Sequence, residues 1–103
     1  MRVLVTGANG FVGRHAVAEL AAHGHVVDAF DRPGAPAHDG PSPIREFFPG
    51  DIRDAAAVAR IVAQAQPEAC LHLAGLAFVP DNRSDPECAF TVHVQGAIHL
   101  LEA

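Results

Sequence analysis

Three glycines spaced three residues apart are the feature of this sequence that most directly suggests chemistry. Gly7, Gly10 and Gly13 lie within residues 6–13 (TGANGFVG), between an apolar run and residues with helical spacing. In such a turn the first glycine permits a sharp bend, the second lets the backbone approach a pyrophosphate, and the third lets helix and strand pack closely. The N–H groups at the start of the helix would meet the phosphate charge. The spacing therefore predicts a dinucleotide site, although an ordinary glycine-rich turn can show the same pattern.

Two acidic residues farther along could hold the adenosine part of a dinucleotide. Asp31 ends a second apolar run, where its carboxylate could accept hydrogen bonds from both ribose hydroxyls and would repel a 2′-phosphate, which favours NAD over NADP. Arg32 follows directly and could bind that phosphate, but a solvated loop arginine is the simpler interpretation. Asp51 follows a third apolar run and could accept from the adenine amino group, while Ile52 could pack on the ring. Asp51 and Ile52 alone are a weak signal.

Apolar runs alternate with helical patterns along the chain. Strands are expected at residues 2–6, 25–30, 44–48 and 69–73, with a proline-rich loop at 33–43. Helices are expected after Gly10, after a cap at Asp54 and from Pro86 onward. Parallel strands joined by helices pair through right-handed crossovers, which gives the order 3-2-1-4. The expected fold class is therefore α/β, a Rossmann-type three-layer fold with a parallel sheet, truncated before a fifth strand.

The last expected helix carries two sets of residues at helical spacing. An apolar stripe is formed by Phe90, Val94, Ala97 and Leu101. A second face is expected to hold Ala89, His93, Gly96 and Leu100. Glycine in a helix interior is less favourable than alanine by about 1 kcal/mol, so Gly96 predicts a close backbone approach.

Charge and composition exclude several other classes of protein. The chain has 7 basic and 12 acidic residues, and the basic residues are scattered arginines, so a nucleic-acid partner is not expected. No run is long enough to span a membrane and the N-terminus does not resemble a signal peptide, so a cytoplasmic location without a membrane partner is expected. Cys70 and Cys88 are expected to be free thiols. The histidines near the N-terminus have no partner at metal-ligand spacing, so no metal site is predicted; they are His15, His23 and His25.

Taken in order, five motifs resemble the extended short-chain dehydrogenase/reductases, and within them the NAD-dependent epimerase/dehydratase family. The motifs are TGANGFVG, Asp31, GDIRD at 50–54, HLAGLAFV at 72–79, and SDP at 84–86 with the closing VHVQGAIHLLEA. HLAGLAFV is similar to UDP-glucose 4-epimerases, while SDP and LLEA also suit GDP-mannose dehydratases and their reductase relatives. The resemblance covers essentially the whole chain and leaves these groups unseparated.

The resemblance implies a role for each residue that matches a family motif. Contacts to the pyrophosphate are implied for Gly7, Gly10, Phe11 and Val12. Asp31 would contact the ribose, and Asp51 with Ile52 the adenine. The ribose on the nicotinamide side would be lined by Leu73, Ala74 and Gly75. Relatives of full length would oxidise a hydroxyl of a nucleotide sugar by hydride transfer to NAD.

The sequence departs from the family pattern in two ways. Family chemistry uses a serine or threonine, a tyrosine and a lysine four residues later, and this chain contains no tyrosine and no lysine. No catalytic residue is therefore assigned, and the chain alone is expected to be inactive. In addition, His93 stands where the family usually has an asparagine, and Ala97 stands where threonine is common.

Three interpretations follow for residues 1–103. The leading one is the N-terminal, dinucleotide-binding half of an epimerase/dehydratase, with the substrate domain absent. The alternative is a non-catalytic NAD(P)-binding or regulatory module, and the third is a remnant that binds nothing. The remnant would show neither cofactor binding nor a stable fold. If the chain folds independently as a module, the strand at 69–73 would be an unprotected apolar edge, which predicts poor solubility or self-association.

Overall fold

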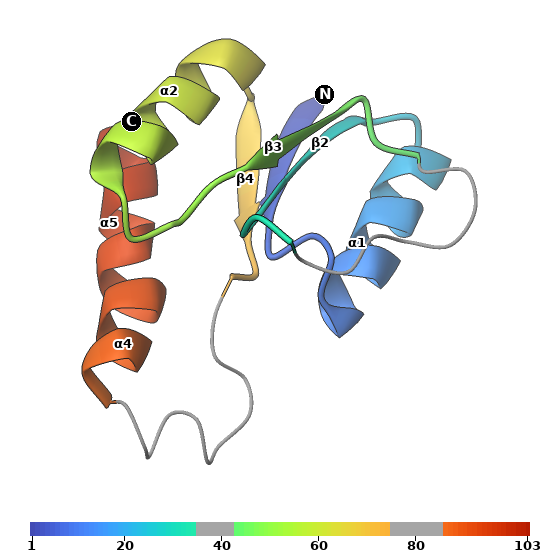
Figure 1. Cartoon of the computed structure of the whole chain (residues 1–103). Coiled ribbons are helices and arrows are strands. Elements are labelled where there is room, and N and C mark those ends of the chain that lie inside the picture. The colour runs from blue at the N-terminus through green and yellow to red at the C-terminus, as the bar shows by residue number, and fades with distance from the viewer. Residues whose placement is uncertain (35–42, 75–85) are drawn as a thin grey trace.

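The computed structural model describes residues 1–34, 43–74 and 86–103. Within these ranges four parallel strands form one sheet, with helices on both faces (Figure 1). The strands are β1 (Arg2–Thr6), β2 (Val26–Asp31), β3 (Glu46–Pro49) and β4 (Ala69–His72), in the order β3-β2-β1-β4. The predicted Rossmann-type order 3-2-1-4 is confirmed.

β1 lies between β2 and β4 and is buried on both faces, as its apolar sequence without alternation predicts. Leu4 packs in one apolar cluster together with Phe30 and Ile61. Val3 and Val5 point to the other face and pack in a second cluster. The sheet therefore separates two cores, each of which needs a helical layer to cover it.

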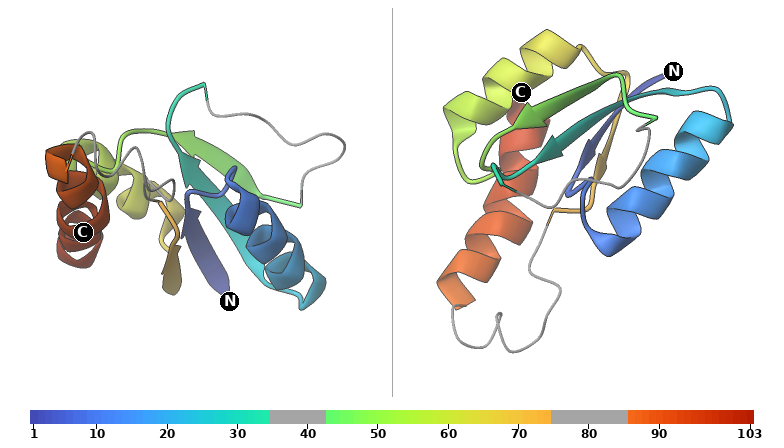
Figure 2. Two further views of the ribbon diagram at one scale, coloured as in Figure 1. Left: turned by 90° about the horizontal axis from the view of Figure 1, so that it is seen from below. Right: turned by 45° about the vertical axis from the view of Figure 1, so that its right-hand side comes forward.

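The helices supply those two layers. α1 (Phe11–Ala22) covers one face of the sheet, while α2 (Ala55–Ala65) and α5 (Gly96–Glu102) cover the other (Figure 2). The carboxylate of Asp54 accepts hydrogen bonds from the N–H groups of Ala56 and Ala57, so the predicted cap of α2 is confirmed. Both α1 and α2 begin a few residues beyond the carboxyl end of the strand that precedes them.

The C-terminal helical segment differs from the single regular helix that was predicted. It consists of α4 (Pro86–Phe90), a π-helical turn η1 (Thr91–Gln95) and α5. Val92 and Leu100 pack against the core, and Gly96 is buried. His93 is exposed, but its backbone and side chain both act on His72 at the end of β4, so it lies on the side of the segment toward the sheet. A π turn widens the helix locally and shifts the faces of the residues around it.

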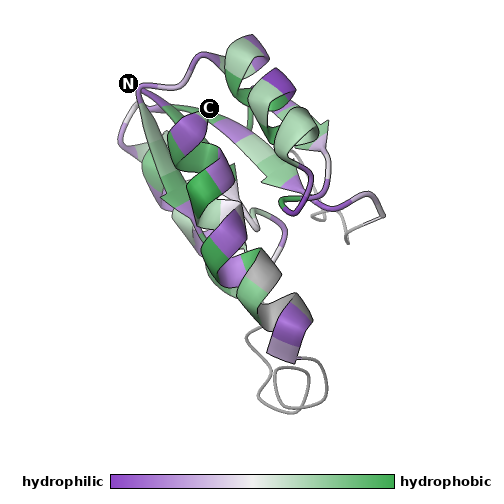
Figure 3. Cartoon of the chain, turned by 90° about the vertical axis from the view of Figure 1, so that its left-hand side faces the viewer, coloured by the Kyte–Doolittle hydropathy of each residue, from purple (hydrophilic) through white to green (hydrophobic). Residues whose placement is uncertain are grey.

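Gly96 explains why this segment can lie so close to the sheet. A Cβ at this position would lie 2.7 Å from Cγ1 of Ile52. The predicted close approach is confirmed, but the neighbour is a side chain and not backbone. Three members of the apolar stripe, Phe90, Val94 and Leu101, are exposed. Figure 3 shows apolar and polar residues mixed along the outer side of this C-terminal helical segment.

An ion pair between a buried carboxylate in β2 and an exposed arginine connects β2 to the residue before β3. Asp28 is fully buried in β2, and its carboxylate accepts hydrogen bonds from Nε and a terminal nitrogen of Arg45. The same guanidinium also donates to the carbonyl oxygen of Ala65 at the end of α2. The bond to Asp28 raises the pKa of Arg45, so the guanidinium keeps its charge. The residue types alone did not indicate this contact.

Candidate functional site

The carboxyl ends of the parallel strands bring the predicted site residues to one edge of the sheet. β1 ends at Thr6 and runs into the glycine turn, β2 ends at Asp31, and β4 ends at His72. Ligands of open α/β sheets bind outside this edge, where neighbouring crossovers lie on opposite faces of the sheet. The fold therefore places the glycine turn where a ligand of this fold class would be held.

The glycine turn is packed too closely to accept larger residues at two positions. Gly7 has a φ of +64°, and a Cβ there would lie 2.7 Å from the backbone nitrogen of Ala74 and 2.8 Å from Leu73. A Cβ on Gly13 would lie 2.2 Å from the carbonyl oxygen of Gly7. These distances confirm the sharp bend at Gly7, and at Gly13 they show close packing of α1 on the turn that follows β1.

Gly10 lies at the open side of the turn and is the N-cap residue of α1. Its N–H donates to the carbonyl oxygen of Gly7 at 3.1 Å, and its own carbonyl accepts from the N–H of Arg14 at 3.0 Å. The N–H groups of Phe11 and Val12 precede that first helical bond, so the helix itself gives them no acceptor. The side chains of Phe11 and Val12 are exposed. Backbone N–H groups at an exposed helix start suit a pyrophosphate.

Asp31 is held against the glycine turn by backbone hydrogen bonds. Oδ2 accepts from the N–H of Asn9 at 2.9 Å, and Oδ1 accepts from the N–H of Arg32 at 2.8 Å. The side chain is half-buried, and each carboxylate oxygen keeps acceptor capacity for a further donor. Arg32 contributes its backbone to this contact and is exposed. Asn9 was missed in the sequence because its contribution is a backbone N–H, which no residue type reveals.

Asp51 and Ile52 lie beyond the end of β3, and both already have partners. The carboxylate of Asp51 accepts from the Arg53 guanidinium at 2.7 and 3.0 Å and from the Arg53 N–H at 2.9 Å. The hydrogen bond from the Arg53 side chain lowers the pKa of Asp51. Ile52 is only 6% exposed, and its carbonyl oxygen accepts from Nδ1 of His99. An adenine ring would therefore have to share the Asp51 carboxylate with Arg53, and it could contact only a small part of the Ile52 side chain.

The end of β4 is joined to the end of β1 by side-chain hydrogen bonds. The buried hydroxyl of Thr6 accepts from the N–H of Leu73 at 3.0 Å and from the N–H of Ala74 at 3.1 Å, and lies 2.7 Å from Nδ1 of His72. Leu73 and Ala74 are half-buried beside Gly7. Gly75, the third residue predicted here, lies outside the described residues. Thr6 and His72 were not assigned a role from the sequence.

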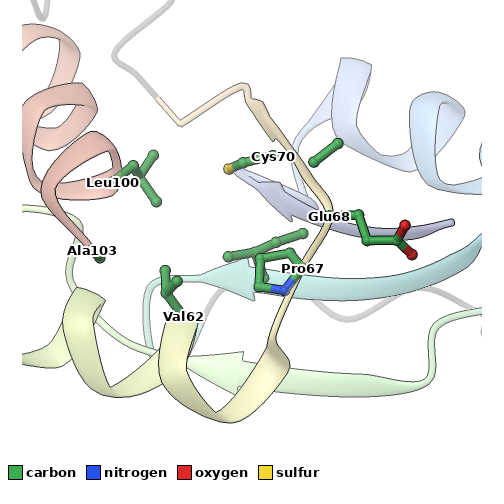
Figure 4. A pocket seen from close by; sticks show the side chains of 8 residues that line it. Val62, Pro67, Glu68, Cys70, Leu100 and Ala103 are labelled. Carbon is green, nitrogen blue, oxygen red and sulfur yellow. The ribbon is translucent and has the colours of Figure 1, made fainter.

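A cavity of about 260 Å³ lies at the other edge of the sheet, between β4, α2 and α5 (Figure 4). It is lined by Leu4, Val62, Pro67, Glu68, Ala69, Cys70, Leu100 and Ala103. The Cys70 sulfur points into it. Although the residue is exposed to solvent, partial desolvation raises the pKa of the thiol to about 11, so the thiol is protonated. Because Pro67 and Glu68 precede β4, this cavity is remote from the glycine turn and separate from the candidate site.

The described part of the chain offers neither a metal site nor a membrane-spanning helix. Within residues 1–34, 43–74 and 86–103, no three His, Cys, Asp or Glu side chains lie close enough to hold a metal ion. No helix in this part of the chain combines the length and apolar character needed to cross a membrane.

Known proteins resemble this chain along almost its entire length. The sequence profile of the NAD-dependent epimerase/dehydratase family matches residues 3–103. A UDP-glucose 4-epimerase from Lactobacillus helveticus is 34% identical over 103 residues, covering all of this chain and 31% of that protein. A CDP-paratose 2-epimerase from Salmonella typhi is 33% identical over 109 residues, covering all of this chain and 32% of that protein.

Solved structures agree with the sequence matches. The UDP-glucose 4-epimerase of Thermus thermophilus, determined in complex with NAD, has a TM-score of 0.88 and 37% identity over 99% of this chain and 33% of that one. The chain thus spans about a third of the length of the relatives it matches. Profile, identity and fold agree over the described sheet and helices, and the chain belongs to the NAD-dependent epimerase/dehydratase family.

Proposed function

We propose that the chain binds NAD at the carboxyl edge of its sheet, as the N-terminal dinucleotide-binding part, residues 1–103, of a nucleotide-sugar epimerase or dehydratase. The observation that carries this proposal is the position of Asp31. Its carboxylate is held by the Asn9 N–H beside the glycine turn, with acceptor capacity remaining for ribose hydroxyls.

The ligand would lie across the strand ends. The pyrophosphate would sit at Gly10, Phe11 and Val12, where N–H groups without a helical acceptor start α1, and Gly13 would support this geometry by close packing. The adenine would extend toward Asp51 and Ile52, although Asp51 is already bonded to Arg53 and Ile52 is nearly buried. On the other side of Gly7, the second ribose would lie along Leu73, Ala74 and Gly75.

The choice of NAD over NADP rests on charge. A 2′-phosphate would approach the Asp31 carboxylate, whose negative charge and lack of a proton to donate both oppose it. The exposed Arg32 could offset this repulsion only in part, since its backbone and not its guanidinium is fixed at Asp31.

In a longer protein, bound NAD would supply hydride transfer at a sugar hydroxyl. This chain would bind and orient the dinucleotide, and the residues that select the nucleotide sugar and move protons would have to come from elsewhere. A second candidate is a non-catalytic NAD(P)-binding or regulatory module, which requires that residues 1–103 fold and bind the dinucleotide by themselves. Self-association through the exposed edge strand β4 is compatible with both candidates.

Isothermal titration of the 103-residue chain with NAD and with NADP tests the proposal. Saturable NAD binding is expected, weakened about 10-fold by Asp31→Asn, because one charged acceptor is removed. Glu19→Gln removes a charge from the exposed side of α1 and serves as the matched control, with affinity unchanged. Folded protein that binds neither dinucleotide, or equal affinity in Asp31→Asn and the wild type, would contradict the proposal.

A further inference from the structure

A buried threonine and a histidine connect the ends of two neighbouring strands, β1 and β4. Thr6 in β1 is fully buried, and its Oγ1 lies 2.7 Å from Nδ1 of His72 at the end of β4. The same oxygen accepts hydrogen bonds from the N–H groups of Leu73 and Ala74; the Leu73 N–H is shared, because it also donates to the backbone carbonyl oxygen of Thr6 at 3.2 Å. These contacts join residues more than sixty positions apart in the sequence.

Counting donors and acceptors assigns the protons in this group. A hydroxyl has one proton to donate and two sites that accept. The N–H groups of Leu73 and Ala74 occupy both accepting sites of Thr6, so its proton must point to Nδ1 of His72. Nδ1 is therefore unprotonated, and the neutral ring carries its proton on Nε2.

The surroundings of His72 favour this neutral form. Nε2 is buried and has no hydrogen-bond partner within the described ranges. Burial lowers the pKa of His72; the backbone of His93 opposes this shift, and the His93 side chain adds to it. His93, in η1, is the titratable group that acts on the ring from the C-terminal helical segment, while β1 presents only the hydroxyl of Thr6.

The backbone that Thr6 holds is the backbone against which the glycine turn packs. A Cβ on Gly7 would lie 2.7 Å from the nitrogen of Ala74 and 2.8 Å from the carbonyl carbon and oxygen of Leu73. A shift of the β4 end would therefore alter the clearance at Gly7. We propose that neutral His72 is a positioning residue, which holds the Thr6 hydroxyl and thereby keeps the β4 end and the glycine turn in the geometry that binds dinucleotide.

Protonation of His72 would break this arrangement. The imidazolium carries a proton on both ring nitrogens, so Thr6 Oγ1 would face three donors with two accepting sites. At least one of the hydrogen bonds to His72, Leu73 or Ala74 must then be lost. The affinity for dinucleotide therefore depends on the protonation of His72. The affinity is highest while His72 is neutral, and it falls as the pH drops through the pKa of His72, which lies below the ordinary value of about 6.5.

The ligand-free chain provides the first test, which does not depend on the proposed NAD site. Long-range ¹H–¹⁵N NMR of His72, assigned by comparison with His72→Asn, should show an unprotonated Nδ1 and a protonated Nε2 at about pH 7.5, above the ordinary pKa of histidine. The amide signals of Leu73 and Ala74 should titrate together with the ring. A ring protonated on Nδ1, or amide signals that do not follow it, would overturn the inference.

NAD affinity measured from about pH 7.5 to about pH 5 provides the second test, and it rests on the proposed function. Wild-type affinity should fall about 10-fold over this range, the loss expected from one strong hydrogen bond. In His72→Asn the amide oxygen can still accept from Thr6 but does not titrate, so this extra pH dependence should disappear whatever the affinity of the variant at about pH 7.5. Thr6→Val should weaken binding about 10-fold at both pH values, whereas Thr6→Ser keeps the hydroxyl and should rescue it.

The outcomes separate the two proposals. The same pH dependence in His72→Asn and the wild type would overturn the role of His72 while leaving the NAD site intact. If the His72 ring carries its proton on Nε2 as expected but the folded chain binds no NAD, the proposed function is wrong. The proposed effect of His72 on NAD affinity would then be wrong as well.

Discussion

Replacement of Gly13 by alanine tests the close packing of α1 on the glycine turn. The new Cβ would lie 2.2 Å from the carbonyl oxygen of Gly7 and 2.7 Å from that of Ala8. Both neighbours are backbone atoms, so the helix or the turn must move by about 1 Å to regain ordinary van der Waals contact. Overpacking costs about 3 kcal/mol at the upper end of its usual range, and the better helix propensity of alanine returns about 1 kcal/mol.

The expected net destabilisation of Gly13→Ala is about 2 kcal/mol, which lowers the Tm by about 8–16 °C for a chain of this size. Thermal unfolding followed by circular dichroism measures it. Gly10→Ala is the matched control in the same turn, because its Cβ would meet only the Gly7 oxygen at 3.3 Å. Its loss as an N-cap is about 0.5–1 kcal/mol. If Gly13→Ala were no less stable than Gly10→Ala, the packing described for this turn would be wrong.

Three further predictions concern other parts of the sheet and its helices. Asp54→Ala should lower the free energy of unfolding by about 1 kcal/mol in urea titrations, whereas Asp54→Asn should retain most of the cap; equal loss in both would contradict a capping role. The lowered pKa of Asp51 means that its pair with Arg53 contributes stability above the unfolded pKa of about 4, and that this contribution is lost as the pH falls through the folded value. Arg53→Gln should therefore be less stable than the wild type by under about 1 kcal/mol at about pH 6 and by less at about pH 3, and a pH-independent difference would refute this assignment. Leu71→Lys should reduce self-association in sedimentation velocity, because Leu71 is exposed on the edge strand β4; a wild-type chain that is monomeric throughout would show that this edge does not pair.

The sheet order and the α2 cap were predictable because both depend on local sequence. Apolar runs separated by helical patterns leave few ways to pair parallel strands, and the cap at Asp54 requires only the next turn of the chain. Gly7 and Gly13 were interpreted correctly for a similar reason. Their spacing between a strand and a helix already implies close backbone contact.

The contacts that could not be predicted join distant parts of the chain. The pairs Thr6–His72 and Asp28–Arg45 form only once the strands are placed side by side. The π turn was missed because it breaks the regular helical spacing from which the faces of the last helix were inferred. The support of Asp31 by Asn9 was missed because it uses the backbone.

A dinucleotide bound as proposed lies across the strand ends, with its pyrophosphate at the start of α1. NMR titration of the ¹⁵N-labelled chain with NAD tests this most directly. We expect saturable shifts of the amide signals of Gly10, Phe11, Val12 and Asp31. Saturable shifts confined to the remote cavity around Cys70, or the absence of any saturable shift in a folded chain, would contradict it.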